Sequence, residues 1–213
     1  VRWQKKLLSS DEGERHWEYW RSQLAGELPI LNLPATRPRP PIQTFRGASE
    51  PFRLSAATAH RLKALSSDHG ATLYMTLLAA FQALLYRYTG QEELLVGSVT
   101  AGRTKAEFAL LIGYFVNPIV LRATISENAT FASFLAQVRR SVLAAFEHQD
   151  YPFSMLVERL EAARDPSRSS LFQVMFSFQN THLTGGEALS LFALGEAGAR
   201  MNLGGLELES LPL

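Results

Sequence analysis

The spacing of apolar residues along the chain predicts five helices. Four of them follow a residue that can cap a helix N-terminus, namely Ser10, Ser55, Thr72 and Thr130. The helix after Thr72 is apolar on nearly every face, so we expect it inside the domain. The predicted helices cover about 11–24, 56–70, 73–88, 131–146 and 153–163.

Shorter apolar runs predict strands between the helices, at 52–54, 94–99, 114–122, 172–178 and 206–209. Pro118 lacks a backbone donor, so its strand should lie at a sheet edge or contain a bulge. Tyr114 and Phe115 are expected in the core. Helices and strands alternate without a strict βαβ repeat, which indicates an α/β fold with a mixed β-sheet layered with helices.

A proline-rich connector interrupts these elements at residues 29–47. Five prolines between Pro29 and Pro41 fix the backbone and remove donors, so neither a helix nor a central strand can form there. Leu31 and Leu33 lie within it, and a free tether has little use for apolar side chains. We therefore expect the connector to lie along a protein surface.

Composition narrows the classes of function. Hydrophobic residues make up 46% and charged residues 19% of the 213 positions, a balance that suits a globular core. The net charge of +1, with acids and bases interspersed, argues against nucleic acid as a partner. The longest apolar run, at 73–85, is too short to span a bilayer, so no membrane partner is expected. The lack of cysteine rules out disulfides and thiolate nucleophiles and fits a cytoplasmic location.

No catalytic or metal-binding constellation stands out from the residues themselves. The five histidines, His16, His60, His69, His148 and His182, are scattered along the chain. There is no G-x-S-x-G elbow and no glycine loop of the kind that cradles phosphate. We therefore predict no catalytic residue, no metal site and no directly bound cofactor.

A series of short strings, taken in order, resembles one family. These strings are Ala101-Gly102-Arg103, Ile112-Gly113-Tyr114-Phe115-Val116-Asn117, His148-Gln149-Asp150-Tyr151-Pro152-Phe153 and Asp165-Pro166-Ser167-Arg168. They are similar to the last signature motifs of the condensation domains of nonribosomal peptide synthetases. Glu18-Tyr19-Trp20 and Thr44-Phe45-Arg46-Gly47 are similar to the opening of the C-terminal lobe of that family.

The resemblance implies the chloramphenicol acetyltransferase fold, in which two α/β lobes enclose a tunnel. Residues 1–213 would be the C-terminal, acceptor-side lobe, with residues 179–213 crossing toward an absent N-terminal lobe. Residues 1–4 resemble the tail of a motif of that other lobe, as if the chain were cut there. The family's catalytic string, His-His-x-x-x-Asp-Gly, has no counterpart here, so the fragment is expected to be inactive alone.

The resemblance also implies a reaction and partners. A condensation domain joins an acyl or peptidyl thioester donor to an aminoacyl thioester acceptor, and both are held by 4′-phosphopantetheine on carrier proteins. The expected partners are the N-terminal lobe, peptidyl or acyl carrier proteins and adjacent synthetase domains, in the biosynthesis of secondary metabolites such as antibiotics. The string from Tyr114 to Pro118 resembles the form of this motif in condensation domains of hybrid polyketide–peptide assembly lines.

Four side chains would lie at the substrate tunnel according to this resemblance: Ser98, Thr100, Arg103 and Asn117. The first two could equally be surface hydroxyls. Arg103 could instead pair with Glu107 at helical spacing. Asn117 could instead satisfy a bulge that Pro118 leaves short of a donor.

Four other motif residues are expected to be structural. His148 should lie near a helix C-terminus, Asp150 should cap the next turn, and Asp165 with Arg168 should stabilise a turn. Two alternatives to the condensation function stay open. One is a non-catalytic module that recognises carrier proteins, and the other is a lobe of an epimerisation or heterocyclisation domain.

Overall fold

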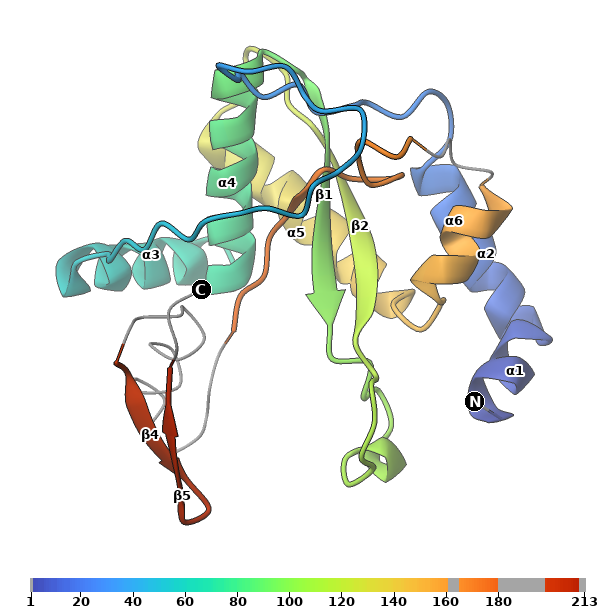
Figure 1. Cartoon of the computed structure of the whole chain (residues 1–213). Helices are drawn as coiled ribbons and strands as arrows, with labels where there is room; N and C mark the ends of the chain where they lie inside the picture. The colour runs from blue at the N-terminus through green and yellow to red at the C-terminus, as the bar shows by residue number, and fades with distance from the viewer. Residues whose placement is uncertain (1, 161–164, 180–197, 211–213) are drawn as a thin grey trace. The chain divides into compact units, whose positions relative to one another are not determined.

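The structure is a computed structural model that describes residues 2–160, 165–179 and 198–210 (Figure 1). The chain divides into two compact units. The first comprises residues 1–43 and 60–177, and the second comprises residues 44–59 and 178–213. A three-stranded sheet belongs to the first unit, and a two-stranded hairpin belongs to the second.

Local capping sequences set where the helices begin. The Ser10, Thr72 and Thr130 side chains each accept a hydrogen bond from the backbone N–H three residues later, and Ser55 Oγ accepts one from Thr58. The four predicted caps are therefore confirmed. The helices are α1 Arg2–Leu8, α2 Asp11–Gln23, α3 Ala56–Asp68, α4 Leu73–Thr89, α5 Phe131–Glu147 and α6 Phe153–Arg159. The short α1 was not predicted, and the predicted end of α6 at Ala163 lies outside the described residues.

The sheet of the first unit is mixed, as predicted. Its order is β2-β1-β3, with β1 and β2 antiparallel and β1 and β3 parallel. Because β2 is an edge strand, the expected position of Pro118 is confirmed. The strands are β1 Glu93–Thr100, β2 Asn117–Thr124 and β3 Val174–Met175, and the hairpin of the second unit pairs β4 Arg200–Leu203 with β5 Leu206–Glu209.

Three strand predictions need correction. Residues 52–54 form no strand, and Phe52 and Leu54 are exposed, because a run of three residues is a weak strand signal. β2 begins at Asn117 and not at Tyr114, since Thr100, its partner in the register, is the last residue of β1. Only two residues of the predicted 172–178 strand pair with β1. The strand β4 lies in a stretch for which no element was predicted.

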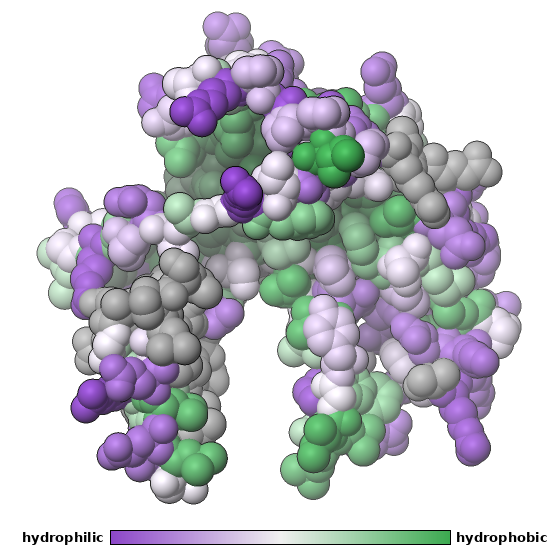
Figure 2. Space-filling model, viewed as in Figure 1, coloured by the Kyte–Doolittle hydropathy of each residue, from purple (hydrophilic) through white to green (hydrophobic). Residues whose placement is uncertain are grey.

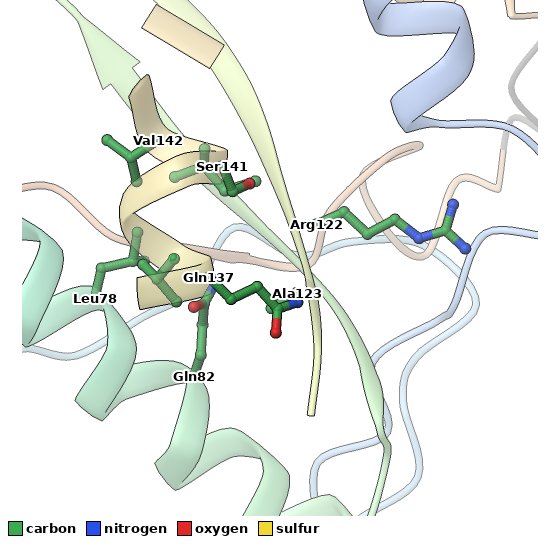
Figure 3. A pocket seen from close by; sticks show the side chains of 9 residues that line it. Leu78, Gln82, Arg122, Ala123, Gln137, Ser141 and Val142 are labelled. Carbon is green, nitrogen blue, oxygen red and sulfur yellow. The ribbon is translucent and has the colours of Figure 1, made fainter. Parts of the chain in front are cut away.

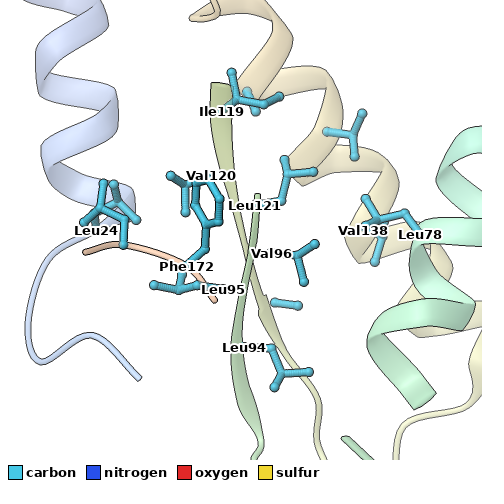
Figure 4. Close-up of a cluster of buried hydrophobic side chains, with 14 of the residues drawn as sticks. Leu24, Leu78, Leu94, Leu95, Val96, Ile119, Val120, Leu121, Val138 and Phe172 are labelled. Atoms are coloured by element: carbon cyan, nitrogen blue, oxygen red, sulfur yellow. The ribbon is translucent and has the colours of Figure 1, made fainter. Parts of the chain in front are cut away.

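Both faces of the β1–β2 pair are apolar and covered. Leu78 of α4 and Val138 of α5 cover one face, while Leu24 and Phe172 cover the other. Side chains alternate along a strand, so each strand contributes to both layers of the core. The strand residues toward α4 and α5 are Leu94, Val96, Ile119 and Leu121, and those toward Leu24 are Leu95 and Val120 (Figure 4).

Residues 29–43 of the proline-rich connector belong to the first unit and lie against its other segments. Leu31 is buried, and its N–H donates to Gln173 Oε1 at 2.8 Å. The Gln91 side chain bonds the connector backbone on both sides of Leu31. Farther along, the Gln43 N–H donates to the Pro166 carbonyl at 2.9 Å. These bonds satisfy part of a backbone that forms no ladder.

Arg122 joins β2 to the end of α2. Its guanidinium donates to the carbonyls of Gln23 and Ala25 at 3.3 and 2.9 Å, and it forms an ion pair with Glu93 at 2.7 Å. These carbonyls have no partner within the helix, so a cation there satisfies them and complements the helix dipole. Arg122 therefore fixes α2 against the sheet.

We expect Arg122→Lys to lower the free energy of unfolding by about 1–2 kcal/mol, because an ammonium cannot reproduce the fork that reaches three oxygens. Urea denaturation of the chain measures the change. The matched control is Arg140→Lys on the exposed face of α5, where we expect no measurable loss. Equal effects of the two substitutions would contradict the bridging role of Arg122.

A small gap between α4, α5 and β2 is not a ligand site. Its volume of about 10 Å³ holds at most one water molecule, and it borders Gln82, Gln137 and Ser141 (Figure 3). Gln82 Oε1 is buried there and has no hydrogen-bond partner among the described residues. Arg122 points away from the gap.

Among the described residues, no helix has the length and apolar character needed to cross a membrane.

Candidate functional site

A cavity of about 640 Å³ lies in the first unit where β2 begins. One wall is the β1–β2 loop, residues 101–116, and another is the segment 149–154 between α5 and α6. Trp3 and Gln4 of α1 complete it. Three strings that are distant in the sequence, at 1–4, 112–117 and 148–153, thus contribute to one cavity. Its aromatic lining residues are Trp3, Phe108, Tyr114, Phe115 and Phe153.

Asn117 holds the segment 149–154 in place. Its Nδ2 donates to the carbonyls of Gln149 and Tyr151, both at 2.8 Å, and its Oδ1 accepts from the Phe153 N–H at 3.0 Å. Thr100 Oγ1 donates to the Asn117 carbonyl at 3.2 Å. Both donors of the carboxamide and its oxygen are therefore bonded to the protein backbone. Asn117 lines the cavity and shapes it, while its polar atoms are already bonded.

A second link joins the two walls. Thr104 Oγ1 donates to Asp150 Oδ1 at 3.0 Å. Asp150 lines the cavity and does not cap the next helix, since the N-cap position of α6 belongs to Pro152. Of the residues that line the cavity, Asp150 is the one that bears a charge. The expected capping role of Asp150 is thus replaced by a bond to the opposite wall.

Arg103 stays on its own loop. Its guanidinium lies 4.3 Å from the Phe115 ring centroid, a cation–π contact, and donates to the Phe108 carbonyl. The contact replaces the alternative pair with Glu107, for which no ion pair is formed in the described part of the chain. Gly102 has φ 62, and a Cβ there would lie 2.8 Å from the Phe115 carbonyl carbon. Both residues therefore shape the loop that forms the cavity wall.

Ser98 and Thr100 are buried in β1. Ser98 Oγ accepts from Tyr74 at 2.8 Å and donates to the Phe176 carbonyl at 2.9 Å. Neither hydroxyl belongs to the lining of the cavity. Burial raises the pKa of the Tyr74 phenol, although the hydrogen bond to Ser98 acts in the opposite direction. This polar chain links α4 to β1 and to the segment after β3, and the assignment of both hydroxyls to a tunnel stays a prediction.

The β1–β2 loop exposes apolar side chains. Tyr114 is 86% exposed, and Leu110 and Ile112 are more exposed still. Figure 2 shows hydrophobic atoms gathered at the tip of this loop. The expectation that Tyr114 belongs to the core is therefore wrong, because the loop projects beyond the paired strands. Phe115 is half-buried and packs against Phe108.

The C-terminal end of α5 brings His148 into contact with α2. His148 Nδ1 lies 2.9 Å from His16 Nδ1, and the Trp20 indole donates to the His148 carbonyl at 3.0 Å. Tyr19 stacks on the His148 ring at 4.1 Å. Burial lowers the pKa of both imidazoles, and burial with the nearby Glu147 raises the pKa of Tyr19 to about 12.

Asp165 and Arg168 lie at a turn away from the cavity. Arg168 Nε is 2.6 Å from Asp165 Oδ2, and the Ser167 N–H donates to Asp165 Oδ1 at 2.8 Å. Hydrogen bonds from Ser167, followed by the nearby Arg168 charge, lower the pKa of Asp165. Arg39 of the connector donates to the Ser167 carbonyl, so the turn also anchors residues 29–43.

The structure brings Asn117 and Asp150 together at the cavity and places Arg103 beside it. Ser98 lies in the core. The sequence interpretation missed Trp3, Phe108 and other lining residues, and it missed His16 as the partner of His148. The string 148–153 contains the signal for Gln149 and Pro152, which also line the cavity. No local signal pairs His16 with a residue 132 positions away.

The described residues hold no group of three or more His, Cys, Asp or Glu side chains arranged to bind a metal. The cavity itself contains no histidine or lysine among its lining residues. An arrangement of this kind can bind an apolar or aromatic group and orient a polar one through Asp150.

Solved structures first define the class of fold. The chain aligns with holo-AB3403, a four-domain nonribosomal peptide synthetase bound to AMP and glycine, with a TM-score of 0.84 and 27% identity over 98% of this chain and 16% of that one. It aligns with the X-domain in its complex with OxyB from teicoplanin biosynthesis, with a TM-score of 0.74 and 30% identity over 81% of this chain and 39% of that one. The fold is chloramphenicol acetyltransferase-like, as predicted.

Sequence relatives then define the family. The chain belongs to the condensation domain family, whose model matches residues 1–203. It is 49% identical over 181 residues to a linear gramicidin synthase polypeptide of Brevibacillus parabrevis, a match that covers 85% of this chain. The chain spans only 4% of the length of that polypeptide.

Proposed function

We propose that the chain is the C-terminal, acceptor-side lobe of a condensation domain in a nonribosomal peptide synthetase. With an N-terminal lobe it would form the amide bond between an acyl or peptidyl thioester and an aminoacyl thioester. The observation that carries the proposal is the cavity at the start of β2, whose walls are built by the strings at 112–117 and 148–153. Strings that resemble the motifs of one family thus form one site.

The proposed reaction needs a base that accepts a proton from the acceptor amine. The acceptor amine attacks the carbonyl carbon of the donor thioester, the new C–N bond forms, and the C–S bond breaks. The amine loses a proton to a base, the base passes this proton to the sulfur, and the donor's 4′-phosphopantetheine leaves as the thiol. We assign that base to the His-His-x-x-x-Asp-Gly string of the other lobe. The present chain contributes by orienting the acceptor, which raises its effective concentration.

The exposed tip of the β1–β2 loop is evidence for contact with a second lobe. Leu110, Leu111, Ile112 and Tyr114 are contiguous or nearly so, and all are exposed. Apolar patches of this kind on an otherwise polar surface mark sites of contact with another protein surface. We propose that the N-terminal lobe covers this tip.

The remaining partners follow from the proposed role. Peptidyl or acyl carrier proteins would bring both substrates on 4′-phosphopantetheine, which belongs to the carriers, and adjacent synthetase domains would flank the lobe. We assign the second unit's hairpin, β4 with β5, to the crossover toward the N-terminal lobe. Residues 180–197 and 211–213 of that crossover lie outside the described residues. The cytoplasmic location stays a prediction.

Reconstitution tests the proposed function. The chain is combined with an N-terminal lobe that bears the His-His-x-x-x-Asp-Gly string and with two loaded carrier proteins, and the amide product is measured by mass spectrometry. We expect product only when both lobes are present. The control is the same N-terminal lobe with both histidines of that string replaced by alanine, for which the rate should fall at least about 100-fold. Inversion of a stereocentre without joining of the substrates would instead indicate an epimerisation domain.

Two donor classes are compared in the same assay. The 49% identity to a peptide synthase favours a peptidyl donor. The string from Tyr114 to Pro118 motivates the alternative, a polyketide-derived acyl donor. Each donor is offered on the same carrier protein. The preferred donor should give the larger kcat/KM for the loaded carrier protein.

A second candidate is a module that recruits another protein without catalysis. The alignment with the X-domain in its complex with OxyB favours it, since that domain is seen bound to a second protein. Here the partner would be a carrier protein. Binding of a loaded carrier protein by this chain, together with no amide formation in the reconstituted pair, would replace the enzymatic proposal with this one.

A further inference from the structure

Two histidines from distant parts of the chain form one hydrogen-bonded pair. His16 of α2 and His148, the residue after α5, approach through their Nδ1 atoms at 2.9 Å with the rings nearly perpendicular. His16 is 7% exposed, while His148 is half-buried. At this distance one Nδ1 must carry a proton and the other must accept it.

The surroundings of His16 indicate which ring carries the shared proton. His16 Nε2 is buried and has no hydrogen-bond partner in the described part of the chain. A neutral imidazole carries one proton, and a buried N–H without an acceptor is a rare and costly arrangement. The proton of His16 is therefore on Nδ1, which donates to His148 Nδ1. The proton of His148 is then on Nε2, which a half-buried ring can present to solvent.

The pair is directly connected to the wall of the cavity. Trp20 donates to the His148 carbonyl at 3.0 Å, and Tyr19 stacks on the His148 ring. Immediately after His148 come the residues 149–153 that Asn117 holds from the other side. Side chains of α2 thus bond His148 at the start of this segment, and Asn117 of β2 bonds the residues that follow. His16 is one of the α2 side chains in these contacts.

An extra proton on either imidazole is incompatible with this arrangement. On His148 Nδ1 it would replace an acceptor with a donor that faces a donor, and on His16 Nε2 it would bury an N–H without an acceptor. The charged groups nearest the pair are Glu12 and Arg15 of α2, Glu147 of α5 and Asp150 of the segment itself. The carboxylates favour protonation and Arg15 opposes it, but burial is the largest effect and lowers the pKa of both rings.

We propose that His16 is a positioning residue, which holds the segment 149–153 against the cavity through His148 only while the two imidazoles carry no extra proton. Because both folded-state pKa values lie below the ordinary value of 6.5, the unfolded or released state binds more protons. The stabilisation is present above pH 6.5 and is lost as the pH falls below it.

Two measurements on the whole chain test this. Long-range ¹H–¹⁵N spectra at pH 7.5 should show His16 protonated on Nδ1 and His148 protonated on Nε2. Hydrogen exchange should show that the protection factor of the Phe153 amide, which donates to Asn117 Oδ1, falls below pH 6.5 by up to about tenfold per pH unit for each of the two imidazoles. Amides of β1 and β2 should keep their protection over the same range.

Variants separate positioning from general stability. His16→Asn can still donate from Nδ2 to His148 and leaves His148 as the one imidazole of the pair that titrates, so the fall in Phe153 protection should shrink to at most about tenfold per pH unit. His16→Ala should lower that protection above pH 6.5, and its difference from the wild type should shrink as the pH falls. The matched control, His69→Asn at an exposed position after α3, should behave like the wild type. If His16→Ala does not fold, the comparison of wild type with His16→Asn still decides the matter.

The same pH dependence in wild type and His16→Asn would overturn the proposal, and so would protonation of His16 on Nε2. A role in amide formation rests on the proposed function, whereas the tautomer and exchange measurements need no substrate. If they give the expected result while the reconstituted lobes form no amide, the proposed function fails and the positioning role stands.

Discussion

Replacing Asn117 with aspartate should lower the free energy of unfolding by about 2–4 kcal/mol at pH 7. The carboxylate keeps the bond from the Phe153 N–H but loses both donors. It would also face the carbonyl oxygens of Gln149 and Tyr151, each 2.8 Å from the present donor. The cost combines two lost hydrogen bonds with repulsion between the carboxylate and two carbonyls left without a donor. Urea denaturation measures it.

The matched control is Asn32→Asp in the exposed connector, which makes the same change of charge without removing a side-chain clamp. We expect its effect to stay within about 0.5 kcal/mol. Similar losses for the two variants would mean that the loss comes from the added negative charge and not from the three hydrogen bonds of Asn117. In the reconstituted reaction, Asn117→Asp should also reduce amide formation, because the segment 149–154 lines the cavity.

The elements that were predicted correctly are those whose signals are local. Ser10, Thr72 and Thr130 each cap a helix with a bond that spans three residues, so the information lies within four positions of sequence. The strand β1 is a continuous apolar run, and it is buried on both sides. The extent of β3 was overestimated because alternation at 172–178 records which face is buried and does not record backbone pairing, which joins β1 only at Val174 and Met175.

The candidate site depended on contacts that no local pattern encodes. Asn117 and Asp150 were selected from strings that resemble a family, and the structure adds that they lie on one cavity. That Asn117 bonds three backbone groups, and that Ser98 is occupied by Tyr74, follows from packing between elements 24 to 36 positions apart. Tyr114 is exposed because β1 ends at Thr100 and β2 begins at Asn117, so Tyr114 lies in the loop between the two strands.

Replacing Gly97 with alanine should lower the free energy of unfolding by about 1–3 kcal/mol. The ring of Phe172 lies directly on the β1 backbone, and a Cβ at position 97 would be 2.6 Å from its Cδ2 and Cζ atoms. The ring cannot move away freely, since it is buried and packs on Phe153 at 5.6 Å. Overpacking of a filled core forces rotamers or backbone to shift, which is the source of the loss.

A double-mutant cycle attributes that loss to the ring. Phe172→Ala alone should cost about 3–5 kcal/mol, but in its background Gly97→Ala should cost almost nothing, because the clashing atoms are gone. Gly47→Ala is the control, since a Cβ there meets nothing within 4 Å. If Gly97→Ala costs the same in both backgrounds, the glycine acts through the β1 backbone and not through Phe172. The cycle also bears on the site, because Phe153, the neighbour of that ring, lines the cavity and donates to Asn117.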